Sequence, residues 1–293
     1  VIAHNARGGI IRKGIALTPV KFGISFTATW FNQAGALIHL YSDGSIHLNH
    51  GGTEMGQGLN TKIAQVVAEA LGVDIARIRI TRTTTEKVPN TSATAASSGT
   101  DLNGMAALDA CRQLLDRLTA FAAETGGVTA DRVRIGEVVE IGTRTLPFAE
   151  FIRQAYMARI QLSAAGFYKT PKIHWNRDTG QGRPFYYFAY GAACSEVTID
   201  TLTGEYRVDR VDILHDCGKS LNPALDIGQI EGGFVQGMGW LTTEELWWDA
   251  QGRLRTHAPS TYKIPACGDR PRVFNVHLFE NENNEDAIFR SKA

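Results

Sequence analysis

The amino-acid sequence predicts an α+β protein built from mixed sheets with helices packed on them. Runs of alternating apolar and polar residues, joined by hairpin-type turns, occur in two separate parts of the chain. Apolar residues at helical spacing follow glycine-rich or small-residue loops. We expect two subdomains, with residues 1–183 in the first and residues 184–293 in the second.

The first strands are predicted between residues 20 and 50. One run covers residues 23–31, and a second covers residues 36–50. Asp43 and Gly44 separate the two alternating halves of the second run, and this dipeptide is typical of a hairpin turn that needs a positive φ. The pair therefore predicts a β-hairpin.

Two helices are predicted after short loops. In the first helix, apolar residues at helical spacing run as far as Gly72, which stands at the C-cap position. A strand over residues 76–85 and a Ser/Thr/Ala/Gly loop over residues 88–99 come next. The second, longer helix covers residues 101–118, and Asp101 belongs to the same face as its leucines.

The same patterns predict the remaining elements. We expect a short helix, a polar turn, a long hairpin, a glycine-containing helix and a small hairpin, followed by two strand-like runs. In chain order, the first five cover residues 148–158, 178–183, 185–216, 225–241 and 249–252.

Composition excludes several classes of protein. Hydrophobic residues make up 43% and charged residues 20% of the chain, as in folded globular proteins. Equal numbers of basic and acidic residues, 30 of each, offer no electrostatic footprint for nucleic acid or an anionic membrane. The sequence has no apolar stretch of membrane-spanning length and no secretory signal, so we expect a cytoplasmic protein that binds a small molecule.

The cysteines predict no metal centre. All four are widely separated, and neither a C-x-x-C motif nor a pair of histidines at ligand spacing accompanies them. We therefore expect buried thiols rather than zinc or iron–sulfur ligands.

Three segments are candidates for binding a ligand. The first loop (residues 51–58, GGTEMGQG) and the second loop (residues 94–100, TAASSGT) each precede a helix, whose free N–H groups can face an anion. Gln57 adds a carboxamide with donors and an acceptor. The third segment (residues 228–233, GQIEGG) places glycines inside a helix, where each costs about 1 kcal/mol relative to alanine. Each segment alone is compatible with tight packing or a tight turn, but together they indicate a cofactor site.

Four sequence motifs identify the chain as a member of a known family. GGTEMGQGLNTK, VPNTSATAASSGTDLNGMA, SLNPALDIGQIEGGFVQGMG and the tail from PSTYKIPA to SKA resemble, in that order, the molybdopterin-binding domains of the molybdenum hydroxylases, in their xanthine dehydrogenase branch. The resemblance covers about Lys13 to Ala293. It implies a molybdenum–pyranopterin centre whose metal is bonded to no protein atom.

The resemblance also implies a reaction. A metal-bound hydroxide attacks an electron-poor ring carbon, hydride passes to a sulfido ligand, and a glutamate takes the proton. Hypoxanthine and xanthine are thereby oxidised to urate with water as the oxygen source. The electrons pass on to [2Fe-2S] clusters and FAD on other parts of the enzyme, and then to NAD or oxygen. A dimer of complete assemblies is the implied oligomer.

Site residues are carried over by position. For the cofactor, the resemblance implies contacts from the following residues: Met55, Gly56, Gln57, Ala96, Ser97, Ser98, Gly99 and Gln229. For the purine, it implies contacts from Phe26, Thr27, Ala95 and Ala96. Two residues depart from the family pattern: Gly99 replaces a serine, which alters hydrogen bonding to the cofactor, and Phe31 replaces a leucine, which alters the width of the substrate channel.

The catalytic glutamate of the family is expected three positions beyond Ala293, so no residue here is named as the base. The chain is expected to be a fragment of a longer polypeptide, with further purine-binding residues upstream of Val1. Glu54 is expected instead to hold the first loop through backbone N–H groups.

Two alternatives remain open from the sequence. Aldehyde oxidase has the same cofactor and similar loops, although residues 22–27 and 94–97 resemble the dehydrogenase more closely. An interpretation from another class is a cofactor-holding module that has no activity when isolated.

Overall fold

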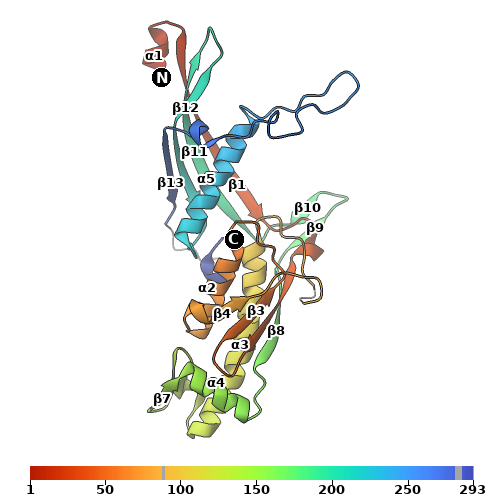
Figure 1. Cartoon of the computed structure of the whole chain (residues 1–293), viewed down its shortest axis with the longest axis vertical. Coiled ribbons are helices and arrows are strands. Elements are labelled where there is room, and N and C mark those ends of the chain that lie inside the picture. The colour runs from red at the N-terminus through yellow and green to blue at the C-terminus, as the bar shows by residue number, and fades with distance from the viewer. Residues whose placement is uncertain (88–89, 281–285, 293) are drawn as a thin grey trace. The chain divides into compact units, whose positions relative to one another are not determined.

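The computed structural model describes residues 1–87, 90–280 and 286–292, so the first two residues of the predicted loop over residues 88–99 lie outside the described part. The chain divides into two compact units (Figure 1). Unit 1 comprises Val1–Phe22 and Ala189–Glu282, and unit 2 comprises Gly23–Phe188 and Asn283–Ala293. Mixed sheets with packed helices confirm the predicted fold class, while the subdomain boundary between residues 183 and 184 stays a prediction.

Unit 1 is built on a four-stranded sheet with the strand order β1-β11-β12-β13. The hairpin of β11 and β12 is antiparallel and confirms the hairpin expected from the sequence, whereas β13 lies parallel to β12. Helix α5 packs on β13 through Phe234 and Phe274, whose ring centroids are 5.5 Å apart. The elements of this unit are α1 (Ile2–Ala6), β1 (Ile11–Ile24), β11 (Tyr187–Asp200), β12 (Tyr206–Asp216), α5 (Pro223–Trp240), η4 (Cys267–Asp269) and β13 (Val273–Leu278).

Unit 2 contains a second four-stranded sheet with the order β4-β3-β2-β8, and helices α2 and α3 pack against it (Figure 1). The buried core lies between these helices and the sheet. Its elements are η1 (Thr29–Phe31), β2 (Gln33–Leu40), β3 (Ile46–His50), α2 (Leu59–Leu71), η2 (Ile75–Arg77), β4 (Ile78–Ile80), α3 (Gly99–Gly126), β8 (Ser163–Lys169) and η5 (Ile288–Arg290).

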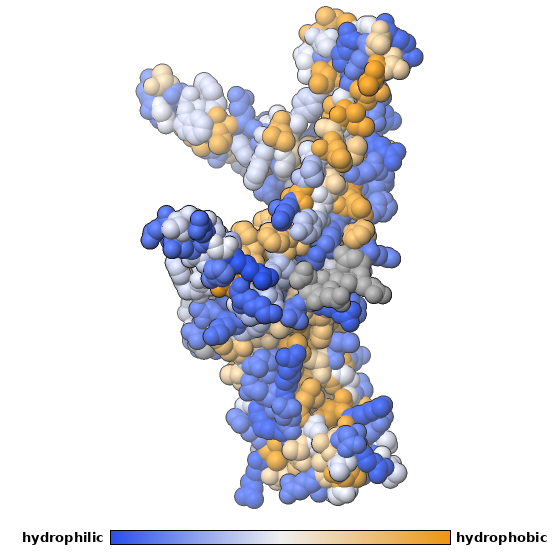
Figure 2. Space-filling view, turned by 180° about the vertical axis from the view of Figure 1, so that it is seen from behind, coloured by the Kyte–Doolittle hydropathy of each residue, from blue (hydrophilic) through white to orange (hydrophobic). Residues whose placement is uncertain are grey.

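Smaller elements complete unit 2. A three-stranded sheet carries α4 at its side, and a separate two-stranded hairpin lies between β8 and β11 in the sequence. These elements are η3 (Ala130–Arg132), β5 (Val133–Arg134), β6 (Val138–Ile141), β7 (Arg144–Pro147), α4 (Phe148–Met157), β9 (His174–Asn176) and β10 (Gln181–Arg183). Apolar side chains are also exposed at scattered positions on both units (Figure 2).

The predicted turns and the predicted end of the first helix are confirmed by the structure. Gly44 has φ of 81° in the β2–β3 hairpin, as the Asp-Gly pair predicts. Gly72 has φ of 67° at the end of α2, where its N–H bonds back to the helix. The small hairpin near residue 250 also forms, with Trp248 paired to Leu254.

Three strand predictions were wrong in part. The run over residues 23–31 leaves the strand after Ile24, because the buried side chain of Asn32 bonds the backbone of Phe26 and Thr29 and bends the chain. The strand over residues 76–85 shortens to β4. Of the two final strand-like runs, the described residues form only β13.

A glycine in β8 allows α3 to approach the sheet closely. A Cβ on Gly166 would overlap the carbonyl oxygen of Ala106 and lie 2.6 Å from the nitrogen of Ala110. Both atoms belong to the helix backbone, so neither can move alone. The contact therefore requires glycine.

We expect Gly166→Ala to lower the free energy of unfolding by about 2–3 kcal/mol, because overpacking against backbone cannot relax through a rotamer change. Urea unfolding of the chain measures this. Gly228→Ala is the control, since a Cβ there meets nothing within 4 Å and should stabilise α5 by up to about 1 kcal/mol. Equal effects of the two substitutions would contradict the account.

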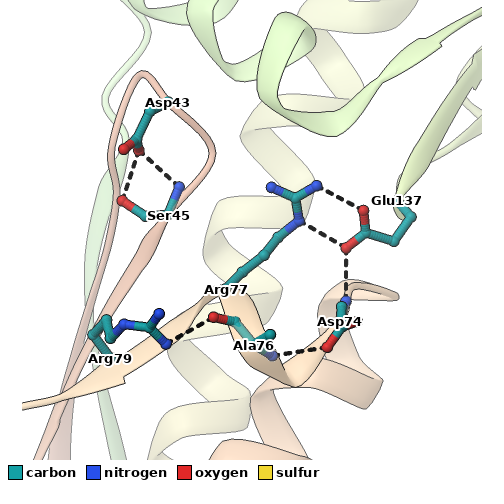
Figure 3. Close-up of a pocket in the computed structure, with 7 residues that line it drawn as sticks. All are labelled: Asp43, Ser45, Asp74, Ala76, Arg77, Arg79 and Glu137. Atoms are coloured by element: carbon teal, nitrogen blue, oxygen red, sulfur yellow. Dashed lines mark hydrogen bonds and ion pairs between the residues drawn. The ribbon is translucent and has the colours of Figure 1, made fainter.

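An ion pair ties η2 to the segment before β6 in a surface pocket (Figure 3). Arg77 Nε and Nη2 each lie 2.7 Å from an oxygen of Glu137, and the N–H of Asp74 donates to the same carboxylate at 2.7 Å. The Arg77 guanidinium, followed by the Asp74 N–H, lowers the pKa of Glu137 to about 2.

Replacing Glu137 with glutamine should lower the free energy of unfolding by only about 1 kcal/mol, because 42% of the Glu137 side chain is exposed and water screens the pair. The test is urea unfolding at neutral pH, with Glu140→Gln on the exposed side of β6 as the matched control. A loss above about 3 kcal/mol would show that the pair is more than a surface bridge.

Candidate functional site

The first loop turns sharply between β3 and α2 and is held by Glu54. Its carboxylate accepts hydrogen bonds from the N–H groups of Gly56 at 2.9 Å, Gly58 at 3.1 Å and Asn60 at 2.9 Å. Burial alone would raise the pKa of Glu54, but these N–H bonds outweigh burial and lower it. The prediction that Glu54 holds the loop is therefore confirmed.

Gln57 folds back on its own loop. Its Oε1 accepts from the N–H of Met55 at 2.6 Å, and its Nε2 donates to the carbonyl of Thr53 at 2.8 Å. One Nε2 hydrogen is left after these bonds. Gly56 has φ of 102°, a Cβ on it would meet nothing within 4 Å, and Met55 is 67% exposed. A ligand can therefore approach the loop backbone closely.

The second loop adopts an uncommon backbone. Ala96 and Ser97 have φ of 56° and 49°, which places two successive non-glycine residues in the left-handed region. Successive N–H groups in such a turn form a concavity that binds anions. Such conformations cost of order 1 kcal/mol or more each and are found mostly at functional sites.

Helix α3 begins within this loop with its first N–H groups available. Ser98 is the N-cap residue, but its hydroxyl donates to the carbonyl of Ala95 at 3.1 Å. No side chain in the described ranges caps the helix. The N–H groups of the first turn and the helix dipole therefore favour a negatively charged group at this end.

The two loops contact each other. The N–H of Thr53 donates to Oγ1 of Thr94 at 2.9 Å. A Cβ on Gly51 would overlap the side chain of Thr91, which lies three residues before the second loop, so glycine is needed for this approach. The structure thus brings together two segments that are separated by about 40 residues in the sequence.

The turn with Phe26 and Thr27 precedes a strand whose first residues lie beside the second loop. Asn32 Oδ1 accepts from the Phe26 N–H at 2.7 Å, and the Phe26 ring meets Phe31 edge-on at 5.6 Å. Phe26 is half-buried and Thr27 is exposed. Gln33, which follows this turn, lines a cavity of about 10 Å³ together with residues of the second loop.

Gln229 lies in the other compact unit, exposed on α5. A Cβ on Gly228, Gly232 or Gly233 would meet nothing within 4 Å. The tight packing with which the sequence of this segment was compatible is therefore not found at these glycines among the described residues. Open space lies beside these glycines among the described residues.

Sequence reasoning missed the buried polar groups beneath the loops. One side-chain atom in each of His50, Asp101 and Asn103 is buried and has no hydrogen-bond partner among the described residues: Nε2 of His50 and Oδ1 of the other two. The sequence offered a signal only for Asp101, a polar residue on a helical face of leucines. Among the described residues, no three His, Cys, Asp or Glu side chains are placed to hold a metal ion.

The structure describes no helix that is both long and apolar enough to cross a membrane. Uncapped N–H groups at the start of α3 and the left-handed turn at Ala96 and Ser97, beside the first loop, are the features that an anionic ligand would satisfy. They therefore mark the loop side of unit 2 as the candidate binding site.

Comparison with known proteins gives consistent results. The chain is 49% identical to "Xanthine dehydrogenase/oxidase" of Felis catus over 282 residues and 48% identical to "Xanthine dehydrogenase" of Dictyostelium discoideum over 284 residues. Each alignment covers 96% of this chain but only 20% of the relative, so the chain spans about a fifth of their length.

Solved structures show the same fold. A Cu,Mo-CO dehydrogenase matches 99% of this chain and 37% of its own with a TM-score of 0.84 at 20% identity. Quinoline 2-oxidoreductase of Pseudomonas putida 86 matches 97% of this chain and 36% of its own with a TM-score of 0.80 at 24% identity. The family described as "Molybdopterin cofactor-binding domain" matches residues 2–271. The chain therefore belongs to the molybdopterin cofactor-binding domain family, as its sequence motifs predict.

Proposed function

We propose that this chain holds the molybdopterin cofactor, and one side of a purine substrate, within a molybdenum hydroxylase that oxidises hypoxanthine and xanthine to urate. The observation that carries the proposal is 49% identity to a xanthine dehydrogenase/oxidase along 96% of this chain. Similarity to solved structures below 25% identity supports the fold alone and does not select a substrate.

The geometry of the two loops fits a pterin with a phosphate. The uncapped start of α3 and the left-handed turn at Ala96 and Ser97 supply N–H donors for an anion. The remaining Nε2 hydrogen of Gln57 and the open backbone at Gly56 supply a polar edge. We assign the cofactor to Met55, Gly56, Gln57, Ala96, Ser97, Ser98, Gly99 and Gln229, and the purine to Phe26, Thr27, Ala95 and Ala96.

When bound, the molybdenum cofactor supplies the two-electron oxidation. The overall change is xanthine plus water giving urate, two electrons and two protons. This chain orients the reactants: the half-buried Phe26 ring packs against a flat substrate, and Thr27 offers an exposed hydroxyl to its edge. Placing reactants in this way lowers the entropic part of the barrier.

Glu54 is not proposed as the general base, because its two oxygens are already committed to three backbone N–H groups. We propose that the base, the [2Fe-2S] clusters and the FAD belong to the rest of a larger enzyme, which assembles as a dimer in the cytoplasm. Those centres would supply the path by which the electrons leave the site.

The test is to purify the complete enzyme and measure its molybdenum, its pterin and its turnover of xanthine and of an aromatic aldehyde. The proposal predicts both cofactor components and urate formation at least tenfold faster than aldehyde oxidation. Oxidation of the aldehyde without urate formation would support an aldehyde oxidase instead. Urate formation by the isolated 293 residues would overturn the division of roles proposed above.

A further inference from the structure

Asn103, in the second turn of α3, lies close to a residue of each of the two loops. Its Nδ2 donates at 2.8 Å to the carbonyl of Gly99, which is both the first residue of α3 and part of the second loop. A Cβ on Gly52, in the first loop, would lie 2.8 Å from Nδ2 and 3.2 Å from Cγ of the same side chain. One carboxamide therefore touches both loops.

The Gly52 contact leaves little freedom on either side. The carbonyl of Gly52 accepts from Thr83 Oγ1 at 2.9 Å, which fixes the peptide that follows Gly52. The side chain of Asn103 is only 5% exposed. A shift of its carboxamide would therefore move the backbone of the first loop, the start of α3, or both.

The chemistry of this side chain is unusual for a position that serves packing alone. Its Oδ1 is buried and has no hydrogen-bond partner among the described residues. Asn103 also lines the cavity of about 10 Å³ that it shares with Ser98, which has room for a group of about the size of one water molecule. An apolar side chain of similar size would avoid the unsatisfied acceptor.

We propose that Asn103 is a positioning residue that keeps the two loops in register for the cofactor. The inference rests on the proposed function, because it assigns the loops to molybdopterin binding. It also separates two roles: the carboxamide of Asn103 is retained for the geometry of the loops, whereas its hydrogen bond to Gly99 is offset by its unsatisfied Oδ1 and leaves no net gain in the stability of the fold.

The test compares Asn103→Leu with the wild type in the complete enzyme. Leucine has a similar size and removes the unsatisfied acceptor, so the thermal midpoint should be unchanged or higher. Pterin and molybdenum per protein should fall about fivefold, and pterin should dissociate about fivefold faster. Turnover per bound molybdenum should stay within twofold of the wild type, because Asn103 is not assigned to the reacting atoms.

Asn49→Leu is the matched control. Asn49 is equally buried, donates to Thr81 Oγ1 and has the same unsatisfied Oδ1, but it lies on β3 outside both loops. This variant should keep wild-type pterin content. If Asn103→Leu does not fold, Asn103→Ala is the second variant, because alanine adds no bulk. Its pterin content should also be about fivefold lower than that of the wild type.

Wild-type pterin retention in a folded Asn103 variant would overturn the proposal, as would an equal loss of pterin in Asn49→Leu. A wild-type enzyme without molybdopterin would instead overturn the proposed function itself. The two failures are therefore distinguishable.

Discussion

Gln57→Ala should lower the molybdenum and pterin content of the complete enzyme by about ten- to a hundredfold. The substitution removes two hydrogen bonds that close the first loop, with the Met55 N–H and the Thr53 carbonyl, and it removes the one Nε2 hydrogen that these bonds leave over. Each bond contributes about 1 kcal/mol, and about 1.4 kcal/mol corresponds to a tenfold change in binding.

The measurement is molybdenum by elemental analysis and released pterin by fluorescence, each per mole of purified enzyme. Gln113→Ala is the matched control, because Gln113 lies exposed on α3, where its carboxamide bonds Asp109 and the Ala165 carbonyl. It should retain wild-type cofactor. Wild-type content in Gln57→Ala would remove the first loop from the binding site.

Asp101 should make the unfolding of the chain depend on pH in an unusual direction. Burial raises the pKa of this carboxyl from 3.8 to about 7, although the Ile288 N–H and the Tyr187 hydroxyl act to lower it. At a pH between these two pKa values, Asp101 is protonated in the folded chain and ionised in the unfolded chain. The free energy of unfolding should therefore fall as the pH rises from about 4 to 7, by up to about 4 kcal/mol, and then level off.

Asp101→Asn keeps the shape of the side chain and cannot ionise, so this fall should vanish. At about pH 8 the variant should be more stable than the wild type, whereas at about pH 4 the two should be similar. Urea unfolding across this range tests the prediction, with Asp116→Asn on the exposed side of α3 as the control. Parallel pH profiles for wild type and Asp101→Asn would contradict it.

The sequence predicted the parts of the fold that local chemistry decides. Asp43 and Gly44 form their hairpin and Gly72 ends its helix, because each needs only a positive φ that glycine adopts freely. The strand predicted over residues 23–31 ends early, for a reason unrelated to the spacing of its apolar residues. The side chain of Asn32 captures the backbone at Phe26, and hydropathy patterns do not record such a bond.

The sequence predicted the separate loops of the candidate site, but not how these loops contact each other or which backbone conformation they adopt. Glycine and glutamine density pointed to residues 51–58, and small side chains pointed to residues 94–100. The bond between Thr53 and Thr94 joins segments far apart in sequence, which no local rule predicts. The left-handed backbone at Ala96 and Ser97 was also hidden, since alanine and serine are not residue types that signal positive φ.

The buried groups depend still more on tertiary packing. Asn103 lies against Gly52 only because α3 packs behind the first loop, and its unsatisfied oxygen appears only in the folded chain. Spacing along the helix placed Asp101 among leucines but gave no measure of how its carboxyl would titrate.

The most direct test of the central claim is an experimental structure of the complete enzyme with its cofactor bound. We expect the pterin and its phosphate to lie within hydrogen-bond distance of Gln57, of the N–H groups at the start of α3 and of Gln229. A purine analogue should contact Phe26 and Thr27. A cofactor bound away from both loops would contradict the assignment of this chain as its binding site.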